Sequence, residues 1–287
     1  MKIKPVILCG GSGTRLFPGF KNVPSKQFID FGGWNLFEKT LDRIKNTIFD
    51  TPVISTNTIY KNLVLRALKK SKISKYKIVL EPIKKNTAAA IISSCLLDEI
   101  KLNQPILFIP SDHFMPKKEI FNKILYSNLK NLHGNNIFIF GVKPKTPTSK
   151  YGYILNKKIN KNINKVINFI EKPKKALAIK LIKNKALWNS GIVLARKDSI
   201  INNAKIYQKN LFTHCLKSLI KVSQNKKIIK LNKKSFNKII PISFDYAILE
   251  KVKEINSISL NNSWSDLGSW SEIFKILKTQ IKKNLLK

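Results

Sequence analysis

The chain has 287 residues, 43% of them hydrophobic, and a formal net charge of +38 from 54 Lys and Arg against 16 Asp and Glu. This length and hydrophobic content are sufficient for one large α/β domain or two small ones. No segment reaches the roughly 18 consecutive apolar residues needed to cross a bilayer, which excludes a membrane-spanning helix and predicts no membrane partner.

The alternation of short apolar runs with helical patterns predicts an α/β fold with crossover helices. In the first half we expect strands at 3–9, 52–56, 77–80, 105–109 and 136–142, and helices at 36–48, 60–70 and 87–102. Beyond residue 142 the pattern predicts shorter strands at 152–155, 166–171 and 191–195, then helices at 198–223, 245–252 and 269–283. There is no internal repeat and no Pro/Gly/Ser linker, so we expect a single domain over 1–287.

The excess positive charge comes from lysine, because only four of the basic residues are arginine. Lysine accompanies abundant Asn and Ile, and all three have A/T-rich codons, so a low-GC genome explains lysines spread over solvated faces. No specific nucleic-acid partner is therefore predicted. Nonspecific binding of polyanions remains an alternative.

The cysteines and the N-terminus both indicate the cytoplasm. Cys9, Cys95 and Cys215 are odd in number, widely spaced and in apolar surroundings. They predict neither a disulfide framework nor a metal-ligand pair, which fits a reducing compartment. The first residues lead directly into a strand, so no signal peptide is expected.

A glycine-rich loop follows the first predicted strand, where residues 6–16 are VILCGGSGTRL. Glycines allow successive backbone N–H groups to point at one anion, and Arg15 and Lys26 add positive charges nearby. The loop lacks the Gly-Lys-Ser/Thr end of a Walker loop, and it has Leu16 where a dinucleotide fingerprint needs its third glycine. The pattern indicates a polyphosphate-binding loop, with an ordinary tight turn as the alternative.

Two isolated acidic residues follow apolar runs. Asp112 lies just after the run 106–109, at the carboxyl end of a predicted strand, where ligands of open α/β sheets bind. A carboxylate there, facing a phosphate loop, is a typical Mg²⁺ ligand. Asp266 lies in WSDLGSW at 264–270, before a predicted helix. The structural alternative for Asp112 is a surface residue that caps a turn, and the alternative for Asp266 is a residue that begins the helix.

Nine segments together carry a resemblance to a known family: LCGGSGTRLFP at 8–18, SKQF at 25–28, EP at 81–82 with NTA at 86–88, PSDH at 110–113, YGYI at 151–154, EKP at 171–173, WNSG at 188–191, DYA at 245–247 and WSDLGSW at 264–270. On these segments the chain resembles the sugar-nucleotide pyrophosphorylases, most closely the bacterial mannose-1-phosphate guanylyltransferases. Ser25 stands where the family has proline before the lysine, and Lys150 replaces a glycine.

The resemblance implies a nucleotidyltransferase fold, with a Rossmann-like mixed, mostly parallel central sheet flanked by helices. It implies a reaction of GTP with mannose 1-phosphate giving GDP-mannose and pyrophosphate. Residues 1–142 would then bind the nucleotide, and residues 143–287 the sugar phosphate. The same chemistry on glucose 1-phosphate with UTP or dTTP is the first alternative, and a non-catalytic polyanion-binding protein is the second. The resemblance is compatible with a homodimer.

The implied site residues fall into three groups. Arg15, Lys26, Asp112 and Asp266 are the expected catalytic residues, and Asp112 and Asp266 would hold Mg²⁺. Glu81 would accept N1–H and N2–H₂ of guanine, and His113 would orient Asp112. The expected nucleotide-binding residues are Leu8, Gly10, Gly11, Ser12, Gly13, Thr14, Arg15, Lys26, Glu81, Asn86, Thr87 and Asp112, and the expected sugar-phosphate residues are Gly152, Glu171, Lys172 and Asn189.

Overall fold

The computed structural model describes residues 1–11, 25–160, 162–220, 222, 224, 226–260 and 264–285. The strands are β1 (Lys4–Cys9), β2 (Val53–Asn57), β3 (Lys77–Glu81), β4 (Pro105–Pro110), β5 (Ile137–Val142), β6 (Tyr153–Lys158), β7 (Asn164–Ile170), β8 (Leu187–Arg196), β9 (Ile228–Lys230) and β10 (Ile255–Ser259). The helices are α1 (Leu36–Arg43), α2 (Lys61–Lys70), α3 (Asn86–Cys95), α4 (Lys118–Asn128), α5 (Lys175–Lys183), α6 (Lys197–Tyr207), α7 (Lys209–Leu219), α8 (Lys233–Asn237) and α9 (Trp270–Leu285). Short 3-10 segments η1 (Lys26–Phe28), η2 (Thr58–Tyr60) and η3 (Leu129–Asn131) and a π-helix, η4 (Asp245–Leu249), complete the described elements.

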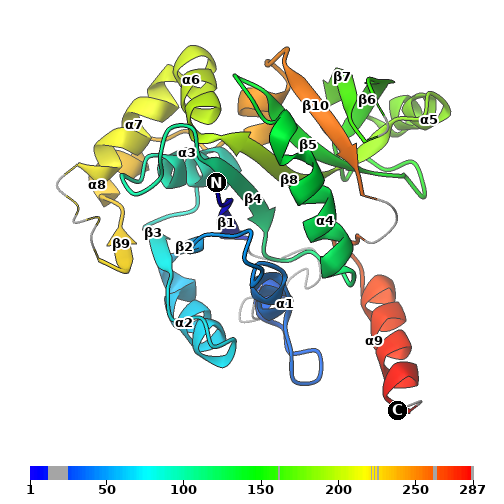
Figure 1. Ribbon diagram of the computed structural model, residues 1–287, viewed down its shortest axis with the longest axis horizontal. Coiled ribbons are helices and arrows are strands. Elements are labelled where there is room, and N and C mark those ends of the chain that lie inside the picture. Colours follow the sequence, from blue (N-terminus) through cyan, green and yellow to red (C-terminus); the bar gives the residue numbers. More distant parts are fainter. Residues whose placement is uncertain are drawn as a thin grey trace.

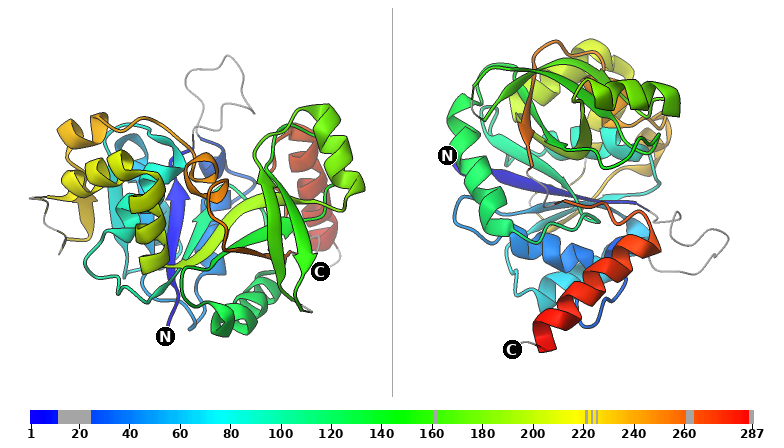
Figure 2. Two further views of the ribbon diagram at one scale, coloured as in Figure 1. Left: turned by 90° about the horizontal axis from the view of Figure 1, so that it is seen from above. Right: turned by 90° about the vertical axis from the view of Figure 1, so that its right-hand side faces the viewer.

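Parallel strands in the order β9-β3-β2-β1-β4 form one half of the sheet, with β1 inside it (Figure 1). Neighbouring residues of each strand face opposite sides: Val6 packs into one apolar core and Ile7 into the other. Helices α3, α6 and α7 cover the first side, while α1 and α2 cover the second, so that β1 lies between two helical layers (Figure 2). Both faces are buried, which explains the nearly continuous apolar sequence of these strands.

The other half of the sheet is mainly antiparallel. Strand β8 pairs antiparallel with β4, β5 and β6, β7 pairs antiparallel with β6 and β10, and β10 returns parallel to β5. The described strands therefore form a mixed sheet, as expected, but parallel pairing predominates only in the first half. The expectation of a mostly parallel sheet took no account of the short hairpin strands β6 and β7, which pair directly with one another.

Two predicted helices end early because polar side chains compete for their backbone groups. α1 begins with a capping box at Asn35 and ends at Arg43, and the side chain of Asn46 then accepts a bond from the Ile48 N–H. α3 ends at Cys95 instead of residue 102. The Lys197 ammonium donates to the carbonyls of Leu97 and Ile100, at 2.8 Å each.

The helix predicted at 198–223 is two helices, α6 and α7, separated at Gln208. Gln208 has an extended φ of −142°, and its side chain donates to the carbonyl of Ala247 in η4. Neither Pro nor Gly marks this break, so only the tertiary contact could have revealed it. Helices α4, α5 and α8 and strands β9 and β10 were not predicted; of these, α4 and α5 begin without a side-chain cap.

The three cysteines are free and buried, as expected, and burial raises the pKa of each thiol. Within the part of the chain that the structure describes, no helix combines the length and the hydrophobicity that crossing a membrane requires.

Candidate active site

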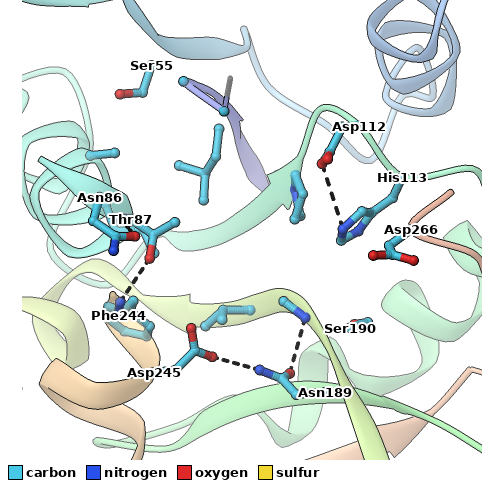
Figure 3. Close-up of a pocket in the computed structure, with 18 of the residues that line it drawn as sticks. Ser55, Asn86, Thr87, Asp112, His113, Asn189, Ser190, Phe244, Asp245 and Asp266 are labelled. Carbon is cyan, nitrogen blue, oxygen red and sulfur yellow. Dashed lines mark hydrogen bonds and ion pairs between the residues drawn. The ribbon is translucent and has the colours of Figure 1, made fainter. Parts of the chain in front are cut away.

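A cavity of about 890 Å³ opens at the carboxyl ends of the parallel strands and extends to the antiparallel half (Figure 3). The strand register places Leu8 beside Ser55 and Pro110, and Asn57 beside Glu81. Most expected site residues line this cavity from both halves of the sheet: Leu8, Gly10, Gly11, Glu81, Asn86, Thr87, Asp112, Gly152, Glu171, Lys172, Asn189 and Asp266. Ser12, Gly13, Thr14 and Arg15 lie outside the described residues.

Gly10 and Gly11, the first glycines of the glycine-rich loop, border open space in the cavity. A Cβ added at Gly10 or Gly11 would have nothing within 4 Å, and neither glycine has a left-handed φ. The Gln27 amide donates to the Gly11 carbonyl at 3.1 Å and so fixes the loop to η1, which begins at Lys26. The absence of side chains at these two positions leaves the backbone accessible to a ligand.

Glu81 ends β3 with its side chain in the cavity and is only 5% exposed. The Ser55 hydroxyl donates to Glu81 Oε1 at 2.7 Å. Burial raises the pKa of Glu81 to about 7, and the Ser55 bond opposes that shift. The carboxylate is held in place by one partner while it lines a space large enough for a ligand.

The first turn of α3 forms the adjacent wall. Asn86 has a φ of 66°, and its side chain accepts from the Thr87 N–H at 2.8 Å. Thr87 Oγ1 in turn accepts from the Phe244 N–H at 2.9 Å. Thr87 thus connects the wall formed by the first half to the segment that begins η4.

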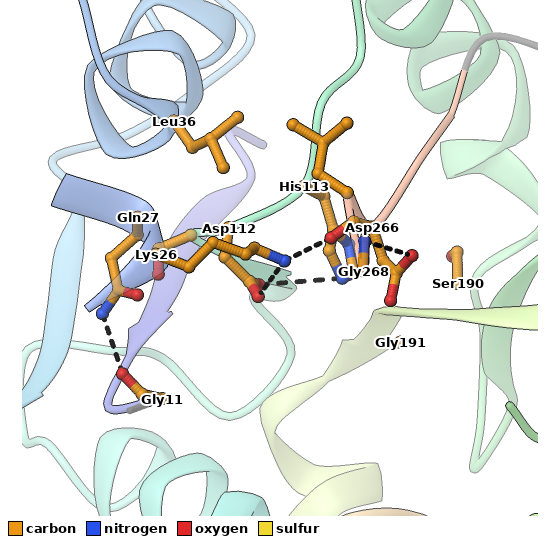
Figure 4. A network of polar contacts seen from close by, with 12 residues as sticks. Gly11, Lys26, Gln27, Leu36, Asp112, His113, Ser190, Gly191, Asp266 and Gly268 are labelled. Carbon is orange, nitrogen blue, oxygen red and sulfur yellow. Dashed lines mark hydrogen bonds and ion pairs between the residues drawn. The ribbon is translucent and has the colours of Figure 1, made fainter. Parts of the chain in front are cut away.

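Lys26 joins the two acidic residues (Figure 4). Its ammonium lies 2.8 Å from Asp112 Oδ2 and also donates to the backbone carbonyl of Asp266. Burial would raise the pKa of Asp112, but the positive charge of Lys26 outweighs it and holds the pKa below its usual value. Lys26 does not itself line the cavity; it contacts Asp112, which does.

A two-residue antiparallel bridge brings the acidic segments together. Phe114 and Ser265 exchange backbone hydrogen bonds of 2.9 and 3.0 Å, next to Asp112 and Asp266 respectively. The Asp266 carboxylate is 5% exposed and accepts from the Tyr151 hydroxyl at 2.6 Å and from the Gly268 N–H at 3.2 Å. Both acids therefore lie on one wall of the cavity, although they are far apart in the chain.

His113 lies between the two carboxylates in Figure 3 and has a defined tautomer. The Trp264 indole donates to His113 Nδ1 at 3.1 Å, so the proton of the neutral ring is on Nε2, which is 3.7 Å from Asp112 Oδ1. Burial lowers the pKa of His113 to about 4. A neutral ring that presents Nε2–H toward Asp112 fits the expected orienting role.

The opposite end of the cavity contains Glu171 and Lys172. Lys172 has a left-handed φ of 47°, and its ammonium lies 3.1 Å from Glu171 Oε1. Such a backbone conformation is uncommon for lysine and often marks functional sites. Burial raises the pKa of Glu171.

Gly152 is required by close packing against Glu171. A Cβ at this position would lie 2.6 Å from Glu171 Oε2 and 2.9 Å from Phe169 Cζ. Gly152→Ala is expected to lower the free energy of unfolding by ~1–3 kcal/mol, since the buried Phe169 ring and the Glu171 carboxylate must both move away. Urea unfolding monitored by circular dichroism measures this change. Gly10→Ala, which meets no atom within 4 Å, is the matched control and should change stability by less than ~0.5 kcal/mol. Equal losses in both variants would contradict the packing argument.

Several cavity residues were not among the expected site residues, and Ser55, Tyr151 and Asp245 are those whose side chains bond to expected ones through a hydroxyl or a carboxylate. Ser55 could have been found from its place near the end of β2, beside Leu8 in register. Tyr151 and Asp245 belong to quoted motifs, but nothing in the local sequence shows that they contact Asp266 and Asn189.

The donor set fits a magnesium ion that also binds a phosphate ligand. Among the described residues, no three His, Cys, Asp or Glu side chains come together as a metal site. Asp112 and Asp266 instead supply two hard carboxylates, and Mg²⁺ is usually bound by one or two carboxylates together with substrate phosphates and water.

Comparisons with known proteins agree on one family. The model of the nucleotidyl transferase family ("Nucleotidyl transferase") matches residues 4–283. A mannose-1-phosphate guanylyltransferase of Escherichia coli is 29% identical over 98% of this chain and 63% of its own length. One of Sinorhizobium fredii is 30% identical over all of this chain and 57% of its own length. The chain thus spans less than two thirds of these curated relatives.

A solved structure shows the same fold. The crystal structure of a protein titled mannose-1-phosphate geranyltransferase, from Thermus thermophilus, superposes with a TM-score of 0.80 at 22% identity. The match covers 96% of this chain and 79% of that one.

Proposed function

The chain belongs to the nucleotidyl transferase family, and from this we propose that it joins GTP and mannose 1-phosphate to give GDP-mannose and pyrophosphate. The observation that carries the proposal is that Asp112 and Asp266 line the same cavity and that Lys26 contacts both residues. The similarity to proteins named mannose-1-phosphate guanylyltransferase supports this choice of substrates. The proposed homodimer has no structural support and stays a prediction.

The two walls of the cavity would divide the substrates between them. The triphosphate would bind at the glycine loop, with the backbone of 10–14, Arg15 and Lys26 as its donors. The sugar phosphate would bind opposite, with Lys172 on its phosphate and Glu171 and Asn189 on sugar hydroxyls. Gly152 would allow Glu171 to lie close to the backbone.

The chemical step needs no general base. An oxygen of the sugar phosphate forms a bond to the α-phosphorus as the bond from that phosphorus to the β-phosphate oxygen breaks, and pyrophosphate leaves with that electron pair. The attacking phosphate has a second pKa of about 6 and is largely ionised at neutral pH. The main obstacle is repulsion between two anions, which Lys26, Arg15 and Lys172 would reduce. When bound by Asp112 and Asp266, Mg²⁺ would add charge neutralisation at the phosphates.

A substrate panel tests the proposal. We expect magnesium-dependent release of pyrophosphate to be fastest with GTP and mannose 1-phosphate among GTP, ATP, UTP and dTTP, each paired with mannose and glucose 1-phosphates. Preferred turnover of glucose 1-phosphate with UTP or dTTP would replace the proposed pair. Duplex binding with a steep salt dependence and no turnover would favour a polyanion-binding protein.

Glu81 is the proposed reader of guanine. Glu81→Gln is expected to lower the preference for GTP over ATP by ~10–100-fold, because an amide cannot accept from N1–H and N2–H₂ together. Since the pKa of Glu81 is raised to about 7, its carboxyl is increasingly protonated below that pH and increasingly ionised above it. The KM for GTP should therefore fall as pH rises through 7.

The pH profile of the Glu81→Gln variant is the control. This variant has no carboxyl group at position 81, so any pH dependence that remains comes from other groups, including GTP itself. Steady-state kinetics across this pH range, run on both proteins, measures the difference between them. If both proteins show the same profile and the same base preference, guanine is recognised elsewhere.

A further inference from the structure

Asp245 lies at the start of η4 and lines the cavity opposite the acidic wall. Within η4 the Glu250 N–H donates to the Asp245 carbonyl at 3.0 Å, which is the five-residue spacing of a π-helix. π-helices are rare and occur frequently at functional sites. Asp245 is therefore on an unusual backbone segment that borders the substrate space.

The segment is held firmly on both sides. The Phe244 N–H donates to Thr87 Oγ1, and Gln208 donates to the Ala247 carbonyl at 3.2 Å. Ser243 Oγ accepts from the Tyr246 N–H at 3.3 Å. These contacts fix Asp245 relative to α3, whose first turn lines the proposed nucleotide end.

Asn189 is locked in one orientation against Asp245. Asn189 Nδ2 donates to Asp245 Oδ1 at 2.7 Å, and Asn189 Oδ1 accepts from the Gly191 N–H at 3.2 Å. The backbone N–H of Asn189 donates to the Gly152 carbonyl at 2.7 Å. Figure 3 shows the second oxygen of Asp245 directed into the cavity, away from Asn189.

The surroundings leave this carboxylate short of compensating charge. Among the described residues, no lysine or arginine lies within ion-pair distance of Asp245. Burial raises the pKa of Asp245 to about 7, and the nearby Glu171 charge adds to the shift. A hydroxyl donor from a ligand would stabilise the ionised carboxylate.

We propose that Asp245 is a specificity-determining residue for the sugar, and that its second carboxylate oxygen, Oδ2, accepts a hydrogen bond from one hydroxyl of the bound sugar phosphate. This inference rests on the proposed function. A sugar inverted at that hydroxyl leaves the enclosed carboxylate without its donor, and an unpaired polar group of this kind discriminates strongly between substrates. The side chain of Asn189, which also accepts from the Gly191 N–H, holds the Asp245 carboxylate in position.

Asp245→Asn tests the second oxygen alone. The asparagine retains Oδ1 as the acceptor for Asn189 and replaces the other oxygen with an NH₂ group, which cannot accept. We expect the KM for the sugar phosphate to rise ~10–100-fold, with the KM for GTP within about twofold of the wild type. We also compare the accepted hexose 1-phosphate with others that are each inverted at one hydroxyl. The preference for the accepted sugar should fall ~10-fold for the sugar inverted at one particular hydroxyl, and should stay unchanged for the rest.

Glu250→Gln is the matched control. It removes one negative charge from the same segment, and its amide oxygen can still accept from the Glu171 N–H, as Glu250 Oε1 does at 3.0 Å. Glu250 does not line the cavity, so both KM values and the discrimination should stay within about twofold of the wild type.

Three results would overturn the inference, and they can be told apart. Unaltered discrimination at every hydroxyl in Asp245→Asn, with normal wild-type turnover, would overturn this inference alone. A wild-type chain that turns over none of the sugar phosphates would overturn the proposed function as well. If both KM values rise together and the thermal midpoint falls, Asp245 is structural.

Discussion

Asp112→Ala is expected to lower turnover by ~10²–10³-fold or more while the protein stays folded, because it removes one of the two proposed magnesium ligands. The Asp112 side chain is 33% exposed and follows β4, so its loss leaves no cavity in either apolar core. Pyrophosphate release at saturating substrate measures turnover. Calorimetric titration with Mn²⁺ in the presence of GTP measures the expected loss of metal affinity independently of activity.

An exposed aspartate outside the cavity provides the control. Asp98 is exposed and borders no part of the site, so Asp98→Ala should retain wild-type turnover and metal affinity. Near-normal turnover of Asp112→Ala would remove Asp112 from the proposed mechanism. Lost turnover with unchanged Mn²⁺ affinity would leave it a role other than metal binding.

Lys26→Ala is the second substitution for which we expect a loss of ~10²–10³-fold in turnover. The Lys26 ammonium would face the leaving phosphates, where preorganised positive charge stabilises the transition state most. In the structure it contacts Asp112 and the Asp266 carbonyl, so its removal also leaves Asp112 without its cationic partner. We therefore expect the thermal midpoint to fall as it does for a comparable buried lysine, and kcat to fall by far more than that loss of stability explains.

Lys4 provides a closely matched control for Lys26. Each lysine is 4% exposed and forms an ion pair with an aspartate, at 2.9 Å to Asp50 for Lys4 and 2.8 Å to Asp112 for Lys26. Lys4 does not border the cavity. Lys4→Ala should lower the unfolding temperature without a specific loss of turnover. If the two variants lose turnover in parallel with stability, Lys26 has a structural role only.

The strands of the parallel half were predictable because most of their residues are buried and are therefore apolar. Val6 and Ile7, or Val53 and Ile54, must both be apolar when each face of the sheet is covered, and such runs are visible without any partner. The glycine loop and Asp112 could be placed for the same reason, since each directly follows one of these runs. The sequence thus predicts that Gly10, Gly11 and Asp112 follow buried strands, and in the structure all three line the cavity.

The second half depends on contacts that a local pattern does not reveal. Asn189 and Ser190 lie outside the strand predicted at 191–195, but in the structure they belong to β8, where Gly191 has a φ of 72° and the pairing with β5 shifts register. Such a bulge allows polar side chains to leave an otherwise apolar strand and face the cavity. β10 was missed because three of the five residues in its sequence, INSIS, are polar, and its pairing with β5 and β7 supplies the stability.

The short pairing of Phe114 with Ser265 has a consequence for biosynthesis. Strands β1 to β4 and the residues up to His113 are made first, whereas Trp264, which bonds His113, comes 151 residues later. The ribosome thus completes the glycine-loop wall long before it releases the second acid. Prematurely terminated polypeptides would carry Asp112 without Asp266, so on the proposed function they would lack one magnesium ligand even where their early strands have formed.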